Sequence, residues 1–219
     1  EAAEDADKGV TAKLLMPPAV DRRLEYLVVS AHLAEHLPAL DAPQLFGLIQ
    51  GGIDAFVQVD FGGGVPARTL RVTRKGPSGE LDPSWTKQNE LWIPVLTPTM
   101  STRVRVTLWD EDFALFGNQL CSTIFLDYAR VRRRAVVRKW FNLYGAPVFA
   151  AGQQADRMNE YPDVASTYRG RLLLSARVVT DEKEMSGHDE AIHALDAARV
   201  MRALRPPTTR YELRALIVS

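Results

Sequence analysis

Short apolar runs, separated by Gly, Pro and Asp, recur along the chain from residue 24 onward. This pattern is typical of a β-sandwich, in which short strands are joined by polar turns. The runs predict eight strands, at 24–33, 54–61, 67–75, 89–96, 103–109, 122–126, 139–144 and 170–179. No helical pattern of similar weight lies between them, so we predict an all-β fold of eight antiparallel strands.

The run 103–109 shows the clearest alternation. A period of two predicts that one face meets the core and the other meets water. The predicted inward set is Val104, Val106 and Leu108, and the predicted outward set is Arg103, Arg105 and Thr107. In the run 67–75, the same rule turns Leu70 and Val72 inward and places Thr69, Arg71, Thr73 and Lys75 on the outward face.

Three other segments lack this alternation. Residues 1–12 are small and charged, and we expect a flexible N-terminal segment over 1–20. Residues 145–168 predict a long irregular connection. Residues 188–204 predict a helix that ends before Pro206, and the apolar tail predicts one more strand. We therefore predict one domain over 21–180, followed over 181–219 by a helical linker and the start of another element.

Composition narrows the classes of function. The 27 basic and 27 acidic residues balance, and no nucleic-acid motif is present, so we predict no nucleic-acid partner. The single cysteine excludes an internal disulfide and favours a reducing compartment. No apolar run is long enough to cross a bilayer. We find no nucleophile elbow, phosphate-binding glycine loop or metalloprotease helix, so we predict that the chain is not an enzyme.

Five stretches follow one another along the chain: LEYLVVSAHLAEHLPALD, IDAFVQVDFGG, LDPSWTKQNELWIPVLTPTMSTRVRVTLWDEDF, WFNLYGAP and YRGRLLLS. Together they resemble an internal C2 domain of the ferlin family. The resemblance covers roughly residues 20–180. It implies an eight-stranded antiparallel C2 β-sandwich with its ligand loops at one end. The type II topology is favoured, because the first strand leads directly into the first acidic loop and GRLLLSARVV closes the sheet.

The resemblance also implies a function. It indicates a phospholipid-binding module of a vesicle-fusion or exocytosis protein, cytoplasmic and peripheral on membranes. The chain starts at Glu1 rather than Met, so we expect a fragment of a longer protein that is membrane-anchored outside this chain. The alternative is a calcium-independent scaffold that contacts a protein partner or the neighbouring domains of the parent chain.

The resemblance implies a calcium site between two loops. Asp41 and Asp54 come from the first loop, and Asp110, Asp112 and Asn118 come from the third. Calcium prefers oxygen ligands, which carboxylates and amides supply. Asn118 brings no charge, however, and PQLFGLIQGG looks like an insertion in the first loop. Acids at strand ends are also often simply solvated, and Asp41 ahead of Ala42-Pro43 is a good helix N-cap.

Zinc is a poor alternative to calcium. One cysteine and four scattered histidines, at 32, 36, 188 and 193, do not make a set of four ligands.

Apolar residues flank these acids. In the first loop, Leu45, Phe46, Leu48 and Ile49 fall on one side of a short predicted helix. In the third loop they are Phe113, Leu115 and Phe116. We predict that both sets insert into a membrane beside the acids. For the first loop, the alternative is that its helix folds back and caps the sandwich.

Basic residues lie in two places. The resemblance makes Arg71 and Lys75 candidates for binding a lipid headgroup, with an anionic phospholipid membrane as the partner. A second group crowds the stretch 130–139, and we interpret its residues 132–134 as a solvated face. Its members are Arg130, Arg132, Arg133, Arg134, Arg138 and Lys139.

Overall fold

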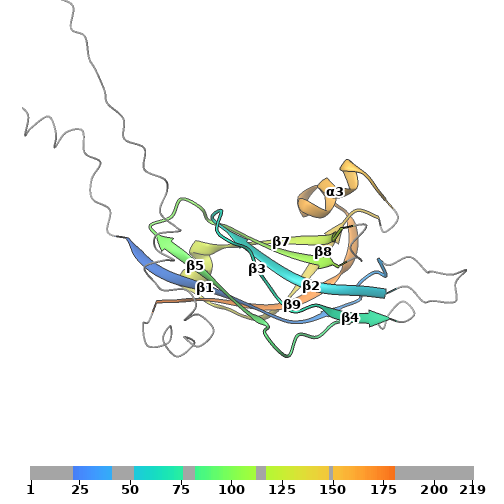
Figure 1. The fold of residues 1–219 in the computed structure, drawn as a ribbon. Helices are drawn as coiled ribbons and strands as arrows, with labels where there is room; N and C mark the ends of the chain where they lie inside the picture. Colours follow the sequence, from blue (N-terminus) through green and yellow to red (C-terminus); the bar gives the residue numbers. More distant parts are fainter. Residues whose placement is uncertain (1–21, 41–51, 76–81, 112–116, 148–149, 181–219) are drawn as a thin grey trace, which may run out of the picture.

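Two antiparallel β-sheets pack face to face along the length of the molecule (Figure 1). The computed structural model describes residues 22–40, 52–75, 82–111, 117–147 and 150–180, with the side chain of Lys75 excluded. The predicted helix 188–204, the tail strand and the N-terminal segment lie outside the described residues.

The first sheet has the strand order β5-β1-β9-β8. Its members are β1 (Arg23–Glu35), β5 (Glu90–Thr97), β8 (Val136–Gly145) and β9 (Thr167–Val179). The last strand, β9, lies between β1 and β8, and Tyr26 of β1 pairs with Val179 of β9. The sequence therefore correctly predicts both the antiparallel sandwich and its type II strand order.

The second sheet has the order β3-β2-β6-β7, and β4 also pairs with β2. Its members are β2 (Gly52–Phe61), β3 (Ala67–Arg68), β4 (Val72–Lys75), β6 (Arg103–Asp110) and β7 (Gln119–Asp127). The register of β2 and β6 pairs Ala55 with Asp110. This pairing brings the start of β2 to the end of β6.

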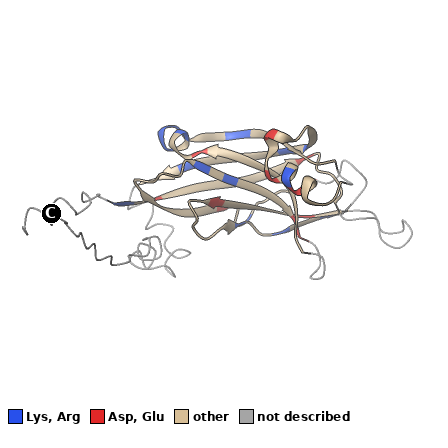
Figure 2. Ribbon diagram, turned by 90° about the horizontal axis from the view of Figure 1, so that it is seen from above, with Lys and Arg blue, Asp and Glu red and all other residues tan. Residues whose placement is uncertain are grey.

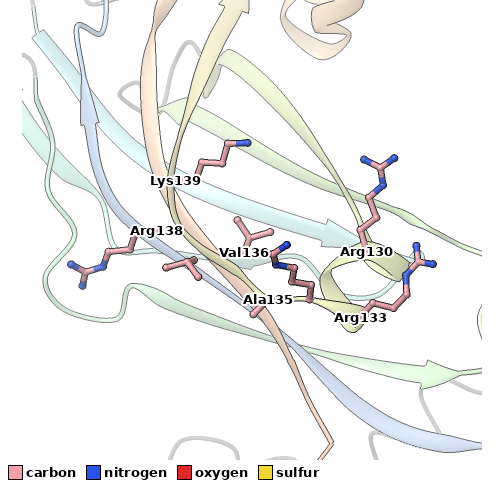
Figure 3. Close-up of a pocket in the computed structure, with 8 residues that line it drawn as sticks. Arg130, Arg133, Ala135, Val136, Arg138 and Lys139 are labelled. Carbon is pink, nitrogen blue, oxygen red and sulfur yellow. The ribbon is translucent and has the colours of Figure 1, made fainter.

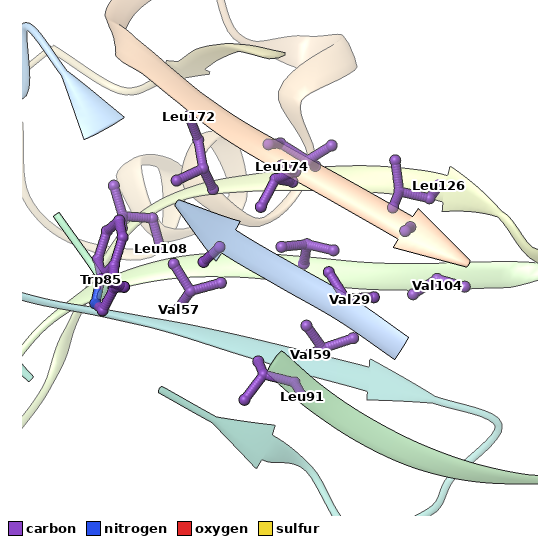
Figure 4. Packing of buried hydrophobic residues seen from close by; sticks show 14 of the residues in the cluster. Val29, Val57, Val59, Trp85, Leu91, Val104, Leu108, Leu126, Leu172 and Leu174 are labelled. Carbon is purple, nitrogen blue, oxygen red and sulfur yellow. The ribbon is translucent and has the colours of Figure 1, made fainter. Parts of the chain in front are cut away.

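The core fills the space between the two sheets (Figure 4). β9 contributes Leu172 and Leu174, and β6 contributes the predicted inward set of Val104, Val106 and Leu108, all at most 1% exposed. Burying a side chain of this size contributes roughly 1.5–3 kcal/mol. The sandwich therefore rests on the alternation that the sequence displays.

The predicted strand 67–75 is broken into β3 and β4. The Thr69 hydroxyl accepts a hydrogen bond from Val57 N, and Thr69 N donates to Val57 O. These bonds draw Thr69 inward, where it is 4% exposed, whereas Leu70 is 50% exposed. The predicted orientation of these two side chains is therefore wrong, and nine strands are described instead of eight.

Thr107 also differs from its predicted outward position, since it is fully buried. The Trp109 indole N–H donates to Thr107 Oγ1, and the Trp109 ring stacks on Phe56. Two aromatic side chains therefore cover part of the face that alternation assigns to water.

The helices are short and were not predicted. α2 (Tyr128–Arg133) follows β7 directly, and its N-cap residue Asp127 accepts a hydrogen bond from Arg130 N. α3 (Gln153–Glu160) and the 3₁₀ helix η1 (Pro162–Val164) lie within 145–168. That segment is therefore partly helical rather than irregular throughout.

Candidate functional site

Three acidic residues meet at one end of the sandwich, where β2 begins and β6 ends. We call Asp54, Asp110 and Glu111 the acid tip. Asp54 N donates to Asp110 Oδ1 over 2.6 Å, and Glu111 N donates to Asp54 O over 2.9 Å. Strand pairing and these two bonds hold two of the predicted calcium ligands, Asp54 and Asp110, side by side.

The acid tip lies partly out of contact with water. Asp110 is fully buried, and the side chain of Asp54 is 24% exposed. Asp54 Oδ1 itself is buried and has no hydrogen-bond partner among the described residues. A buried carboxylate oxygen is costly unless a donor or a cation meets it. The acid tip therefore favours binding of a positive group.

Two arginines supply positive charge beside the acid tip. Arg71 Nη1 lies 3.7 Å from Asp54 Oδ2 and 3.3 Å from Glu111 Oε2. Arg68 Nη1 lies 3.5 Å from Glu111 Oε1. Both guanidinium side chains are about half exposed, so each ion pair contributes only about 0–1 kcal/mol. These contacts are therefore weak enough to exchange for other partners.

The other predicted ligands are placed differently. Asn118 is exposed and precedes Gln119, whose backbone pairs with Asp110. Asn118 lines a hollow of about 460 Å³ together with Asp156 and Glu160 of α3. Asp41 and Asp112 lie outside the described residues. Within the described ranges, no three His, Cys, Asp or Glu side chains lie close enough to form a metal site on their own.

The donor chemistry at the acid tip fits calcium in kind. Asp54 and Asp110 offer carboxylate oxygens, which a hard cation prefers, and one of these oxygens is the buried Oδ1 of Asp54. The two carboxylates supply only part of the six to eight oxygens that calcium takes. The remaining ligands would have to come from the adjoining loops.

The predicted membrane-inserting residues all lie outside the described residues. They are Leu45, Phe46, Leu48, Ile49, Phe113, Leu115 and Phe116. Of the predicted headgroup pair, Arg71 faces the acid tip, and Lys75 pairs through its backbone with Gly52 at the start of β2. Arg71 thus lies beside the acid tip, and its binding of a lipid headgroup stays a prediction.

A buried arginine supports the strands beneath the acid tip. Arg169 on β9 is 2% exposed. Its Nε donates to Ala146 O over 2.7 Å, and its Nη1 donates to Cys121 O over 2.9 Å. Asn159 of α3 accepts from Ala146 N over 2.8 Å. Arg169 therefore ties the start of β7 to the end of β8.

Two glycines make room for this arrangement. A Cβ at Gly145 would lie 2.5 Å from Asn159 Oδ1 and 2.9 Å from Arg169 Cδ. Gly170 has φ +98°, and a Cβ there would lie 2.5 Å from Glu35 O. The stretches WFNLYGAP and YRGRLLLS, which carry part of the family resemblance, thus meet in space at one buried contact.

Sequence reasoning did not identify Arg169 as a functional or structural residue. Strict alternation from the inward Leu172 and Leu174 would turn residue 169 outward. The only signal against this was Gly170, since glycine within a strand often marks a break in the regular pattern.

Burial also raises the pKa of the neighbouring Cys121 thiol to about 11, although the Arg169 charge acts in the opposite direction.

At the other end of the sandwich, Glu25 anchors α2. Arg132 donates to it through Nε over 2.7 Å and Nη2 over 2.6 Å, and Tyr128 Oη donates over 2.9 Å. The Arg132 hydrogen bonds hold the pKa of Glu25 below its ordinary 4.5, although burial opposes them. Burial, and then the bond to Glu25, raise the pKa of Tyr128. The Arg132 side chain is still 52% exposed, so it remains at the solvated face that the sequence suggests, but Glu25 fixes its guanidinium group.

Comparisons with known proteins bear on this arrangement. The model of the C2 domain family matches residues 25–143. Ferlin 2 of Toxoplasma gondii is 28% identical over 168 residues, which are 74% of this chain and 10% of that protein. Ferlin 1 of the same organism is 27% identical over 140 residues, which are 62% of this chain and 9% of that protein. The chain thus spans about a tenth of the length of these relatives.

Among solved structures, the C2A and C2B domains of Extended-Synaptotagmin 2 are similar in fold. The TM-score is 0.50 at 18% sequence identity, over 82% of this chain and 51% of that one.

Proposed function

Because the chain belongs to the C2 domain family, we propose that it is a phospholipid-binding module that meets a membrane with its acid tip. C2 domains are binding modules rather than enzymes. The observation that carries the proposal is the meeting of Asp54 and Asp110, with Arg68 and Arg71 beside them, at one end of the sandwich. Charges of both signs are thereby available to a lipid headgroup within a small area.

Calcium regulation forms part of this proposal. Asp54 and Asp110 are the described residues that would hold the ion, and we propose Asp41, Asp112 and Asn118 as further ligands. Bound calcium would supply positive charge that attracts lipid phosphate. Arg71 lies 3.7 Å from Asp54 Oδ2, so its guanidinium competes for the same carboxylate. Exchange of this partner would leave Arg71 available to a headgroup.

The flanking loops would add apolar contacts. We propose that Phe113, Leu115 and Phe116 enter the acyl region beside the acid tip, together with Leu45, Phe46, Leu48 and Ile49. Each large side chain that leaves water would contribute roughly 1.5–3 kcal/mol. Arg71 and Lys75 would contact the anionic headgroups, where each charge contributes about 1 kcal/mol.

The ferlin relatives suggest the cellular setting. We propose vesicle fusion or exocytosis, with this module peripheral on a membrane and belonging to a longer ferlin-like protein. None of the helices that the structure describes is long and apolar enough to cross a bilayer.

Liposome co-sedimentation tests the proposal. The 219-residue chain would be mixed with neutral or anionic vesicles, in calcium or in chelator. We expect binding to anionic vesicles that calcium strengthens. The Asp54→Asn/Asp110→Asn variant should lose the calcium-dependent part, because Asn keeps the hydrogen-bonding shape but not the charge.

Asp60→Asn is the matched control. Asp60 lies on the same strand, pairs with Arg105 and is remote from the acid tip, so its loss should leave the calcium effect intact. Absence of co-sedimentation with every vesicle would refute membrane binding.

A second candidate function is a calcium-independent scaffold that binds a protein. The ion pairs of Arg71 with Asp54 and Glu111 favour it, because they already neutralise part of the acid tip. Identical vesicle binding in calcium and in chelator would exclude calcium regulation. That result, combined with an unchanged melting temperature in calcium, would support the second candidate.

A further inference from the structure

A second charged site lies where α2 leads into β8. It is a hollow of about 700 Å³, which we call the basic hollow (Figure 3). Five basic side chains line it, together with residues 135–137. They are Arg130, Arg133, Arg134, Arg138 and Lys139. Figure 3 shows that Arg130 and Arg133 come from the helix, whereas Arg138 and Lys139 come from the strand.

The basic hollow carries charge that the rest of the described structure does not neutralise. Several arginines elsewhere have acidic partners, as Arg105 has in Asp60 and Glu160, and Arg171 has in Glu35. Within the described ranges, none of the five side chains of the basic hollow forms an ion pair with Asp or Glu. Figure 2 shows the concentration of basic residues on α2.

Helix stabilisation explains only part of this cluster. Basic residues in the last turn of α2 complement the partial negative charge at a helix C-terminus. Arg138 and Lys139 lie on β8 and cannot serve that purpose. Burial lowers the pKa of His32 on β1, and the positive charge of Arg138 lowers it further. Like charges this close repel one another unless an anion joins them.

The basic hollow is independent of the acid tip. β6 pairs with β7 from Asp110↔Gln119 at the acid tip to Arg103↔Asp127, and α2 begins directly after Asp127. Eight residues of extended strand span about 23 Å. Ligands at the two ends would therefore not compete for the same side chains.

We propose that the basic hollow binds clustered phosphate groups, as presented by an inositol polyphosphate or by a multiply phosphorylated lipid headgroup. Guanidinium groups form two parallel hydrogen bonds to phosphate, and several of them suit a ligand with several phosphates. The volume of the hollow is that of an ordinary small-molecule site. This proposal does not rest on calcium binding or on membrane contact at the acid tip.

The test compares two variants with equal changes in charge. Arg133→Gln/Lys139→Gln removes one charge from α2 and one from β8. Lys87→Gln/Arg157→Gln removes two exposed charges that lie outside the basic hollow. Binding of inositol hexakisphosphate to the full chain would be measured by titration calorimetry in chelator. We expect the first variant to bind about tenfold more weakly or worse, with a flatter dependence on salt, and the control to bind nearly as the parent does.

A second arm distinguishes the sources of phosphate. Phosphatidylcholine vesicles with and without phosphatidylinositol bisphosphate would be co-sedimented with the same variants in chelator. Selective loss in the first variant on the phosphorylated vesicles would assign the basic hollow to a lipid headgroup, and loss only with the soluble probe would assign it to a free polyphosphate. Equal affinity in the two variants, no binding of either probe, or tighter binding of single-stranded RNA than of inositol hexakisphosphate would overturn the proposal.

Discussion

Replacing the buried Arg169 by methionine should destabilise the fold strongly. Arg169 donates to the carbonyl oxygens of Ala146 and Cys121 and is almost fully enclosed. Methionine has a similar length and adapts to an irregular cavity, so the loss of packing should be small. The two carbonyl oxygens, however, would lose their guanidinium donor inside the protein.

Each buried carbonyl without a donor costs about 1–3 kcal/mol, so the two together predict about 2–6 kcal/mol. Removing the desolvated charge offsets part of this cost. We therefore expect a loss of about 2–4 kcal/mol in the free energy of unfolding. For a domain of this size, each kcal/mol lowers the melting temperature by about 2–4 °C.

Urea denaturation of the full chain, followed by tryptophan fluorescence, measures this loss. Arg171→Met is the matched control, because Arg171 lies two residues further along β9 and pairs with Glu35 while 38% of its side chain stays exposed. A surface pair contributes at most about 1 kcal/mol. If Arg169→Met costs no more than Arg171→Met, the carbonyl contacts of Arg169 do not hold the two strands together.

Two further predictions concern Glu25 and the predicted third loop. Glu25→Gln should lower stability by about 1–2 kcal/mol at neutral pH, because its charge is stabilised by Arg132. The folded-state pKa of Glu25 is depressed, so this contribution is complete above pH 4.5, and the difference between variant and parent should shrink as pH falls below that value. A difference that stays constant in urea titrations down to acid pH would contradict this. In the predicted third loop, Phe113→Ser/Phe116→Ser should weaken liposome binding and leave the melting temperature nearly unchanged. A large drop in melting temperature with normal binding would show that these rings belong to the core.

Regular alternation made most of the fold predictable. Val104, Val106 and Leu108 are buried as predicted, because a sandwich strand with one buried face imposes a period of two. Thr69 and Leu70 do not follow the alternation, because hydrogen bonds to residues distant in the sequence fix their positions. Val57 N donates to the Thr69 hydroxyl, and the Trp85 indole N–H donates to Leu70 O. α2 and α3 are six and eight residues long, which is too short for a helical period of apolar residues to be recognised in the sequence.

The candidate site was predictable only in part. The resemblance pointed to Asp54 and Asp110, and the register of β2 and β6 places them together. Arg71 lies in the break between β3 and β4, which alternation did not predict, and it pairs there with Asp54 and Glu111. Arg169 was missed for a similar reason, since the unusual backbone at Gly170 directs it inward.

The pairing of Tyr26 with Val179 has a mechanical consequence. The chain enters β1 and leaves β9 at the same end of two neighbouring antiparallel strands, away from Asp54 and Asp110. Tension transmitted through the residues on either side would open the ladder of hydrogen bonds between β1 and β9 one rung at a time, starting at Tyr26. A strand pair loaded in this way yields at lower force than one pulled along its length. The acid tip belongs to the other sheet and lies at the opposite end of the sandwich, so it would be the last part to feel the load.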